Sequence, residues 1–230
     1  MTPPALTDLQ RSLLVDLKHA GIVMFGESIR AKYGLGPPIY LDLRENLYER
    51  SDLMWRIGGE FACKIRDLAL LDRRPQGIIG VPDTATPLAL AAALYAWQEK
   101  LAPPLQYVLL RQQGKVYGSA PPSYVIGRRA SPEFEYNLID DVMASGLSKW
   151  KAIEKLRGHG IHIRRIVVFF DRQQGGTEML EHEGYSVDAI FKLHEVVDFY
   201  LEERLISSDE HRAIVEFLQT HRFHKPLWSS

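Results

Sequence analysis

Apolar and polar positions along this chain alternate between the period of a helix and the period of a strand. Apolar side chains recur at helical spacing over residues 6–20 and 51–70, and short β-rich runs at 77–81 and 105–111 are bounded by turn residues. The alternation continues to the carboxyl end. It predicts strands over 39–44, 134–140, 163–171 and 185–193, and helices over 87–100, 147–160, 178–184, 196–205 and 208–222.

Helices that alternate with strands in this way indicate a mostly parallel, twisted sheet flanked by helices on both faces. The predicted fold class is therefore α/β. At 230 residues the chain is most simply a single domain over 1–230. Thr7 and Ser208 are expected to cap the first and the last helix, because their hydroxyls can accept hydrogen bonds from backbone amides there.

Residues 112–132 interrupt this alternation with glycines and a Pro121-Pro122 pair. Loops of this length inside a compact domain are uncommon, and they are usually functional or disordered. We therefore expect a long, flexible loop here that takes part in function.

The composition is that of an ordinary globular protein, with 46% hydrophobic and 25% charged residues. Its 28 basic and 29 acidic residues nearly cancel, so any anion site must be local rather than the result of an overall field. No apolar run is long enough to span a bilayer, the first residues lack the apolar stretch of a signal peptide, and a lone cysteine suits a reducing compartment. We expect a cytoplasmic protein that binds neither nucleic acid nor membranes.

The strand predicted over 134–140 leads into two adjacent carboxylates, Asp140 and Asp141, and then into a turn of small residues that opens a helix. Ligands of α/β sheets gather at the carboxyl ends of strands, and a helix N-terminus offers backbone amides to a phosphate. The carboxylates are better suited to ribose hydroxyls and to positive charge on the sugar ring. Taken alone, the same residues equally fit a solvated turn with a helix cap. The phosphate cradle would consist of Ala144, Ser145, Gly146, Leu147 and Ser148.

The segment NLIDDVMASGLSKW resembles the phosphoribosyl pyrophosphate motif of type I phosphoribosyltransferases. Four further segments resemble, in the right order, the successive motifs of orotate phosphoribosyltransferase: MFGESIRAKYGLGPPIYLDLR, GVPDTATPLALAAA, RQQGKVYG and VVFFDRQQGG. They cover most of the chain and are most similar to the transferase domain of bifunctional UMP synthase, although no decarboxylase domain is expected to follow. The resemblance implies a type I phosphoribosyltransferase fold with a small N-terminal hood over 1–45 that contributes to the base site.

The resemblance also implies roles for single residues. Lys115 resembles the loop lysine, and Arg111 the arginine beside it, that reach the pyrophosphate in the neighbouring subunit's site of a homodimer. Arg172 resembles the arginine that pairs with the orotate carboxylate, a planar contact that suits guanidinium. Further substrate-binding positions are a hood lysine, the aromatic residue under the base and a tyrosine of the flexible loop: Lys32, Tyr40 and Tyr117.

The implied activity is a glycosyltransferase reaction in pyrimidine (UMP) biosynthesis, in which phosphoribosyl pyrophosphate and orotate give orotidine 5′-monophosphate and pyrophosphate. The catalytic residues would be Lys115, Asp140 and Asp141. Mg²⁺ is expected as the cofactor and would be held mainly by oxygens of the ligand, because no histidine spacing predicts a metal site made of protein side chains. A complex with an orotidine monophosphate decarboxylase is a further expectation.

Several residues depart from the family pattern. Gln112 stands where a second loop lysine is usual, Gln113 replaces a glutamate, Ala144 a threonine and Asp83 a tyrosine. A glutamine offers pyrophosphate no charged hydrogen bond, and such bonds are about twice as strong as neutral ones. Two alternatives therefore stay open: a phosphoribosyltransferase for another base, and a catalytically silent relative that binds phosphoribosyl pyrophosphate as a regulator or as a subunit of a complex.

Overall fold

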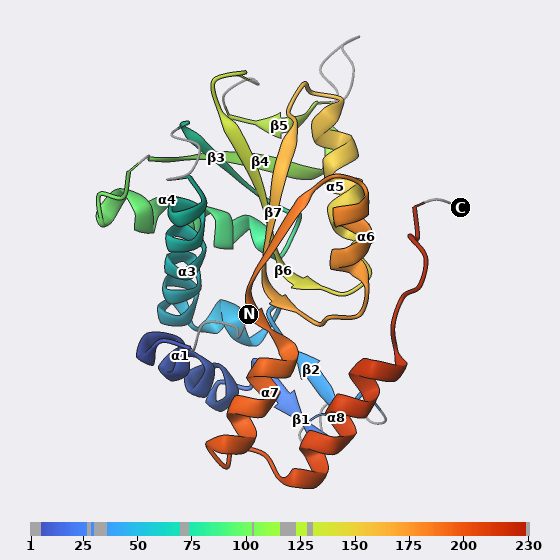
Figure 1. Cartoon of the computed structure of the whole chain (residues 1–230). Helices are drawn as coiled ribbons and strands as arrows, with labels where there is room; N and C mark the ends of the chain where they lie inside the picture. Colours follow the sequence, from blue (N-terminus) through green and yellow to red (C-terminus); the bar gives the residue numbers. More distant parts are fainter. Residues whose placement is uncertain are drawn as a thin grey trace.

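The computed structural model describes residues 6–26, 29, 36–69, 74–102, 104–115, 123–127 and 131–228. A six-stranded sheet forms its centre, in the order β5-β4-β3-β6-β7-β8 (Figure 1). Neighbouring strands run parallel except for β5, which pairs with β4 in the antiparallel direction at the edge. The α/β prediction is confirmed. The strands are β3 (Gln76–Gly80), β4 (Leu105–Lys115), β5 (Ser123–Ile126), β6 (Glu135–Met143), β7 (Ile163–Asp171) and β8 (Ser186–Lys192).

Helices cover both faces of the sheet, as the alternating pattern predicts. α3 (Ser51–Ala69) and α4 (Ala85–Gln98) lie on one face, and α5 (Leu147–Arg157) and α6 (Gly176–His182) lie on the other (Figure 1). α3 and α4 approach closely because Gly58 faces α4, where an added Cβ atom would lie 2.7 Å from the Ala91 backbone. β7 is buried almost throughout between the two helical layers, so its apolar side chains form the centre of the core.

A smaller substructure lies below the sheet in Figure 1 and is built from both ends of the chain. The two ends are joined by the buried Tyr200, whose hydroxyl donates to the Leu14 carbonyl at 2.7 Å and whose ring packs edge-on against Phe25. The hood predicted over 1–45 is therefore completed by two C-terminal helices. Its elements are α1 (Asp8–His19), β1 (Val23–Phe25), β2 (Ile39–Leu41), α7 (Leu193–Glu202) and α8 (Ser208–Thr220), and the short 3₁₀ helix η1 (Asn46–Glu49) leads from it to α3.

Most predicted elements are present, and the differences lie at their ends. Thr7 accepts a hydrogen bond from the Gln10 amide at 3.2 Å, so its capping role is confirmed. The last helix is capped by Ser207 and not by Ser208, because Ser207 and Glu210 satisfy each other's backbone amides in a capping box. β6 does not end at Asp140 but continues to Met143, since its pairing with β7 extends that far.

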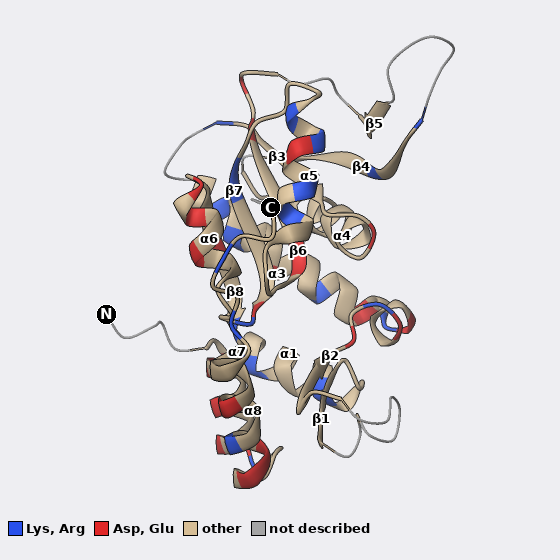
Figure 2. Cartoon of the chain, turned by 90° about the vertical axis from the view of Figure 1, so that its right-hand side faces the viewer, with Lys and Arg blue, Asp and Glu red and all other residues tan. Residues whose placement is uncertain are grey.

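The flexible loop predicted over 112–132 is partly β-structure. β4 continues to Lys115, and β5 pairs with it in a hairpin that projects from the body of the molecule (Figure 2). Gln112, Gln113 and Lys115 are exposed, so this part of the strand has no buried face and no apolar alternation that the sequence could reveal. Residues 116–122 and 128–130 of the predicted loop lie outside the described residues.

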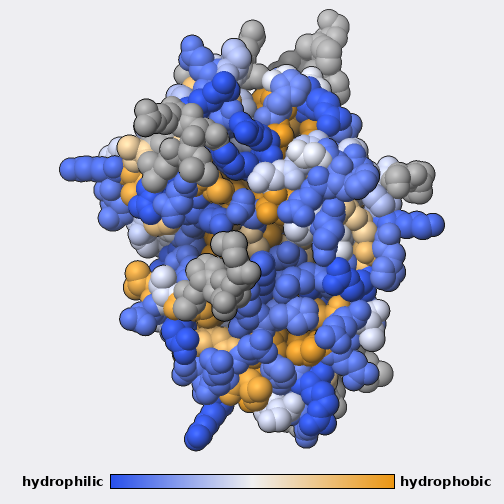
Figure 3. Space-filling model, viewed as in Figure 1, coloured by the Kyte–Doolittle hydropathy of each residue, from blue (hydrophilic) through white to orange (hydrophobic). Residues whose placement is uncertain are grey.

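The face of the molecule seen in Figure 1 is mostly hydrophilic, with apolar side chains in scattered patches (Figure 3). Such patches are ordinary on the surface of a globular protein. Within the described ranges, no helix combines the length and the apolarity that crossing a membrane requires.

Candidate active site

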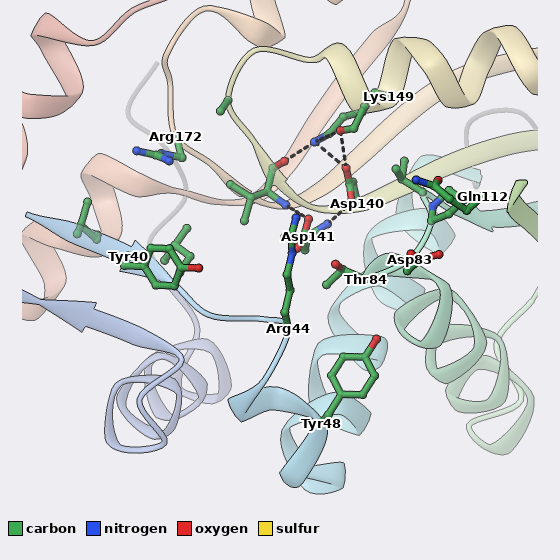
Figure 4. Close-up of a pocket in the computed structure, with 17 residues that line it drawn as sticks. Tyr40, Arg44, Tyr48, Asp83, Thr84, Gln112, Asp140, Asp141, Lys149 and Arg172 are labelled. Carbon is green, nitrogen blue, oxygen red and sulfur yellow. Dashed lines mark hydrogen bonds and ion pairs between the residues drawn. The ribbon is translucent and has the colours of Figure 1, made fainter. Parts of the chain in front are cut away.

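A cavity of about 740 Å³ opens at the carboxyl ends of β3 and β6, between the sheet and the hood. Figure 4 shows side chains from both parts of the molecule pointing into it. The lining residues come from β2 and the segment after it, the turn between β3 and α4, the end of β4, the passage from β6 to α5, and the loop after β7: Ile39, Tyr40, Leu41, Arg44, Tyr48, Val81, Pro82, Asp83, Thr84, Gln112, Asp140, Asp141, Val142, Ala144, Ser148, Lys149 and Arg172.

The turn between β6 and α5 forms one wall of the cavity. Gly146 adopts a φ of 80°, a left-handed conformation that costs glycine little, directly before the first residue of α5. The loop after β7 packs onto this turn, where the Gly176 amide donates to the Ala144 carbonyl at 2.9 Å. A Cβ atom at Gly176 would lie 2.4 Å from that carbonyl oxygen, so this approach requires glycine. The first amides of α5 provide hydrogen-bond donors for an anion, and beside them lies the exposed Ser148 hydroxyl, which donates to Asp140 Oδ2 at 3.3 Å.

Asp140 is buried in an ion pair with a lysine from the first turn of α5. The Lys149 ammonium lies 2.7 Å from Asp140 Oδ2, with 3% and 6% of the two side chains exposed. It also donates to the Val142 carbonyl and, at 3.3 Å, to the Ser148 hydroxyl. The other carboxylate oxygen, Asp140 Oδ1, accepts the backbone amide of Asp141 at 2.9 Å. Both oxygens of Asp140 therefore have partners within the protein.

Asp141 lies in a different environment at the edge of the cavity. Its carboxylate accepts the Val142 amide at 2.7 Å. Burial, followed by the adjacent charge of Asp140, raises the pKa of Asp141 to about 7, and the Lys149 ammonium offsets part of this rise. The two neighbouring carboxyl groups are thus not equivalent.

Two side chains from the segment between β2 and α3 approach the acidic pair. Arg44 points toward Asp141, and Tyr48 rises from below on the same side (Figure 4). Burial, and after it the charges of Asp83 and Asp141, raises the pKa of Tyr48. Its phenol therefore stays protonated at neutral pH and is available as a hydrogen-bond donor.

Arg172 approaches the cavity from the loop after β7, on the same side as Tyr40 (Figure 4). Its amide donates to the Met143 carbonyl at 2.9 Å, which ties the loop to the end of β6. Its Nε is buried without a hydrogen-bond partner among the described residues, and burial lowers the pKa of the guanidinium. A partly buried cation with an unsatisfied Nε favours an anionic ligand, and guanidinium matches a carboxylate best.

Most of the predicted site residues meet at this cavity. Tyr40, Asp140, Asp141, Ala144, Ser148 and Arg172 line it, and Ser145, Gly146 and Leu147 belong to the adjoining turn. Arg111 and Lys115 lie on the projecting hairpin instead, where Arg111 donates to the Ser123 carbonyl at 3.4 Å. Lys32 and Tyr117 lie outside the described residues.

The sequence reasoning missed Arg44, Tyr48 and Lys149. Lys149 had a visible signal, because it occupies the apolar side of α5 together with Ala152, Ile153 and Leu156. A lysine is rarely buried there without a partner. Arg44 and Tyr48 had no such signal, since only the packing of the hood against the sheet brings them to the cavity.

No family model matches the chain. Among curated proteins, it is 30% identical over 213 residues to the orotate phosphoribosyltransferase of Pyrobaculum aerophilum, which covers 91% of this chain and 97% of the relative. It is 26% identical over 212 residues to the uridine 5′-monophosphate synthase of Bos taurus, which covers 92% of this chain and 41% of the relative. The chain spans about two fifths of the length of the UMP synthases from Bos taurus and Caenorhabditis elegans that it matches.

Solved structures show the same fold. UMP synthase of Leishmania donovani gives a TM-score of 0.70 at 26% identity, over 91% of this chain and 42% of that chain. Orotate phosphoribosyltransferase of Francisella tularensis gives 0.68 at 14% identity, over 96% and 100%. The parallel sheet, the hood and these neighbours define the fold class of the type I phosphoribosyltransferases, as predicted. At 30% identity over nearly its whole length to one member, the chain belongs to the orotate phosphoribosyltransferase family.

Proposed function

We propose that this chain is a glycosyltransferase that moves the phosphoribosyl group of phosphoribosyl pyrophosphate to orotate, giving orotidine 5′-monophosphate and pyrophosphate in UMP biosynthesis. The observation that carries this proposal is a single cavity that combines an acidic pair, an adjoining glycine-containing turn at a helix N-terminus, and a partly buried arginine whose Nε has no hydrogen-bond partner among the described residues. Relatives named orotate phosphoribosyltransferase that match over almost their whole length support it.

The donor's 5-phosphate is proposed to bind at the turn between β6 and α5. Backbone amides at the start of α5 and the Ser148 hydroxyl would hold it, and the positive end of the helix dipole would add to the attraction. The ribose would then lie beside Asp141, and the pyrophosphate would extend toward Thr84 and Gln112, which line the same cavity.

In the proposed reaction, a pyrimidine nitrogen of orotate forms a bond to the anomeric carbon while the bond from that carbon to pyrophosphate breaks. The electron pair of the broken bond leaves with pyrophosphate, and the proton of the attacking nitrogen passes to solvent. Positive charge develops on the ribose ring, and the Asp141 carboxylate would stabilise it from the edge of the cavity. No covalent bond to the enzyme is required.

The base is proposed to lie between Tyr40 and Arg172. Both side chains line the same side of the cavity, and the Nε of Arg172 has no partner among the described residues. The guanidinium would form a bidentate contact with the orotate carboxylate, and the Tyr40 ring would pack on the pyrimidine. The predicted contact of Lys32 with the substrates falls outside the described residues.

Mg²⁺ is proposed as the cofactor. In the described ranges no three His, Cys, Asp or Glu side chains group together to hold a metal ion, so we expect the ion to be bound through the oxygens of the donor. When bound, it would neutralise charge on the leaving pyrophosphate.

A homodimer is proposed as the working assembly. The hairpin of β4 and β5, which carries Arg111 and Lys115, projects from the body of the molecule (Figure 2). On α4, Leu90, Leu94 and Trp97 follow one another at helical spacing and are exposed to 43%, 49% and 79%. Large apolar side chains that share one helix face favour a protein interface. If a second copy packs against this face of α4, Lys115 of one subunit would lie near the pyrophosphate bound in the other subunit.

We also propose a cytoplasmic location and a complex with an orotidine monophosphate decarboxylase. Support for the location comes from the single cysteine and from the reducing compartment that it suits. Support for the complex comes from the likeness to UMP synthases, which are longer than this chain.

The activity is tested by following the loss of orotate absorbance with purified protein, phosphoribosyl pyrophosphate and Mg²⁺. We expect turnover that depends on the donor and disappears when Asp140 and Asp141 are both replaced by Asn, whereas Asp209→Asn, an exposed carboxylate on α8, leaves the rate unchanged. Turnover of another base but not of orotate would replace the proposed acceptor. A rise in melting temperature with the donor and no turnover of any base would indicate the silent relative.

A further inference from the structure

Lys149 is a buried lysine whose charge is fully engaged at the candidate active site. Its ammonium has three N–H donors, and they meet the Asp140 carboxylate, the Val142 carbonyl and the Ser148 hydroxyl. Val142 belongs to the end of β6 and Ser148 to the start of α5, so one side chain bridges the strand and the helix on either side of the turn.

Packing alone does not explain a lysine at this position. Lys149 shares the buried side of α5 with Ala152, Ile153 and Leu156, where an apolar side chain of similar length would fill the space without desolvating a charge. A buried ion pair is often no more stabilising than an apolar pair of the same volume. The lysine therefore has a role that depends on its charge.

The partner of the Lys149 charge is the carboxylate of Asp140. Its Oδ2 faces Lys149 at 2.7 Å and Ser148 Oγ at 3.3 Å, and its Oδ1 accepts the Asp141 amide. A ribose hydroxyl would have to compete with these partners for either oxygen. Asp141 borders the cavity, no lysine of the described residues forms an ion pair with it, and it is less buried than Asp140.

We propose that Lys149 is a positioning residue of the phosphoribosyl site: it holds Asp140 as an anchor of the turn and leaves Asp141 as the carboxylate that meets the ribose. This inference rests on the proposed function. It divides between two residues a role that the sequence assigns to Asp140 and Asp141 jointly.

The charge of Lys149 also acts on the ionisation of Asp141. Lowering of the Asp141 pKa by Lys149 opposes the rise caused by burial and by Asp140. Among the described residues, the other charged or titratable groups that line the cavity with Asp140 and Asp141 are Tyr40, Arg44, Tyr48, Asp83 and Arg172. Replacement of Lys149 leaves these groups in place. A change in the pKa of Asp141 in the variant can therefore be attributed to the loss of the lysine charge.

The first test compares the pH dependence of kcat/KM for phosphoribosyl pyrophosphate, over roughly pH 5 to 9, in the wild type and in Lys149→Met. We expect the acidic limb of the variant to move upward by about one pH unit or more, because loss of a nearby cation raises a carboxyl pKa by that order. The donor's own ionisation is common to both proteins. Lys151→Met, the same change on the exposed side of α5, is expected to leave the limb in place. A uniform fall in rate without a shift would overturn the proposal.

The second test applies even if Lys149→Met fails to fold. The double variant Asp140→Asn with Lys149→Met removes both buried charges together, which is far less costly than leaving one of them unpaired. Binding of the donor with Mg²⁺ is measured by titration calorimetry. We expect Asp141→Asn to weaken binding at least about tenfold more than the double variant does, as loss of a charged hydrogen bond predicts. Equal or greater weakening in the double variant would show that Asp140 contacts the ribose and would overturn the assignment.

The two tests separate this inference from the proposed function. Donor binding does not require orotate, so the calorimetric order of the variants holds or fails whatever base the enzyme uses. A wild type that does not turn over orotate but shows the expected order of binding would remove the proposed acceptor and keep the role of Lys149.

Discussion

The charged residues of the candidate active site differ in how far they are buried and in whether an opposite charge lies beside them. Asp140 and Asp141 are neighbours with the same side chain, yet one is ion-paired to Lys149 and the other borders the cavity with a pKa raised to about 7. Arg172 is the reverse case, a cation that is partly buried and has no counter-charge for its Nε among the described residues. Both arrangements cost stability in the absence of ligand and favour a ligand that supplies the missing partner.

The raised pKa of Asp141 predicts how the stability of the ligand-free protein depends on pH. A group whose pKa is raised on folding stabilises the fold below its ordinary pKa, here 3.8, and that contribution is lost as pH rises through the folded value near 7. Asp141→Asn removes this loss of stability at high pH, because the Asn side chain does not ionise. We expect its Tm to exceed that of the wild type by several degrees at about pH 8, at about 2–4 °C for each kcal/mol, and by clearly less at about pH 5, where most of the contribution is still present.

Differential scanning fluorimetry at the two pH values measures this effect. Asp209→Asn on α8 serves as the control, because that side chain is 89% exposed and its replacement should change Tm equally little at both pH values. A Tm gain for Asp141→Asn that is the same at both values would contradict the prediction.

Arg172 gives a second prediction at this scale. Arg172→Lys retains the charge but loses the planar pair of donors, so we expect the KM for orotate to rise by about tenfold or more and the KM for the donor to change little. Steady-state kinetics with each substrate varied in turn measures both constants. Arg212→Lys, an exposed position on α8, should change neither. Equal increases for orotate and the donor would place Arg172 outside the base site.

At the scale of elements, the site depends on close contact between two loops that follow β6 and β7. The turn at the start of α5 touches the first residue of α6, Gly176, whose amide donates to the Ala144 carbonyl. The loop before α6 is held from within by Asp171, which accepts the Gln173 amide at 2.7 Å and the Thr177 hydroxyl at 2.9 Å. The phosphate-binding turn and Arg172 are thus parts of one packed unit.

Gly176→Ala is expected to damage this unit. Its Cβ would lie 2.4 Å from the Ala144 oxygen, so the turn must shift, with a cost of about 1–3 kcal/mol in stability and weaker binding of the donor. Urea denaturation and calorimetry measure the two effects. Gly158→Ala is the matched control, because a Cβ there would meet its nearest atom at an ordinary 3.5 Å. If both variants behave alike, the contact does not position the turn.

At the scale of the whole molecule, the chain closes on itself, because the N-terminal helix and the C-terminal helices form one hood. Arg11 pairs with Glu203 at 2.7 Å, and the Tyr200 hydroxyl bonds to Leu14. The segment after α8 continues this closure, since Phe223 donates its amide to the Gln174 carbonyl and Trp228 stacks on Trp150 at 5.0 Å. The end of the chain therefore packs against α5 and against the loop before α6, beside the candidate active site.

The proposed homodimer is tested at the same scale. Leu94→Glu places a charge in the centre of the exposed apolar face of α4, so we expect a monomer by light scattering and a fall in kcat of at least about tenfold, as Lys115 no longer reaches a neighbouring site. Leu9→Glu on α1 changes an apolar side chain that is 77% exposed elsewhere and should stay dimeric. A wild-type monomer with full activity would refute the assembly.

The class of the fold and the centre of the site can be inferred from the amino-acid sequence without the structure. The alternation of apolar periods predicted the strands and helices of the sheet, because each period reflects the face that its own element buries. The acidic pair lies near the carboxyl end of β6, and the small-residue turn and Arg172 follow strands directly, so their places at the carboxyl edge of the sheet could be read locally. Lys149 was missed, although the sequence shows it as a lysine on the apolar face of a helix.

The tertiary structure alone decided which of these residues act on one another. Pairing of Lys149 with Asp140, the approach of Arg44 and Tyr48, and the contact of Gly176 with the turn depend on how separate elements pack. β5 and the end of β4 were missed because their residues are exposed or only partly buried and so show no clear alternation of apolar and polar positions. The hood depends on the contact of Tyr200 with Leu14, which lies near the other end of the chain. The local period of apolar positions cannot predict a contact between residues so far apart in the sequence.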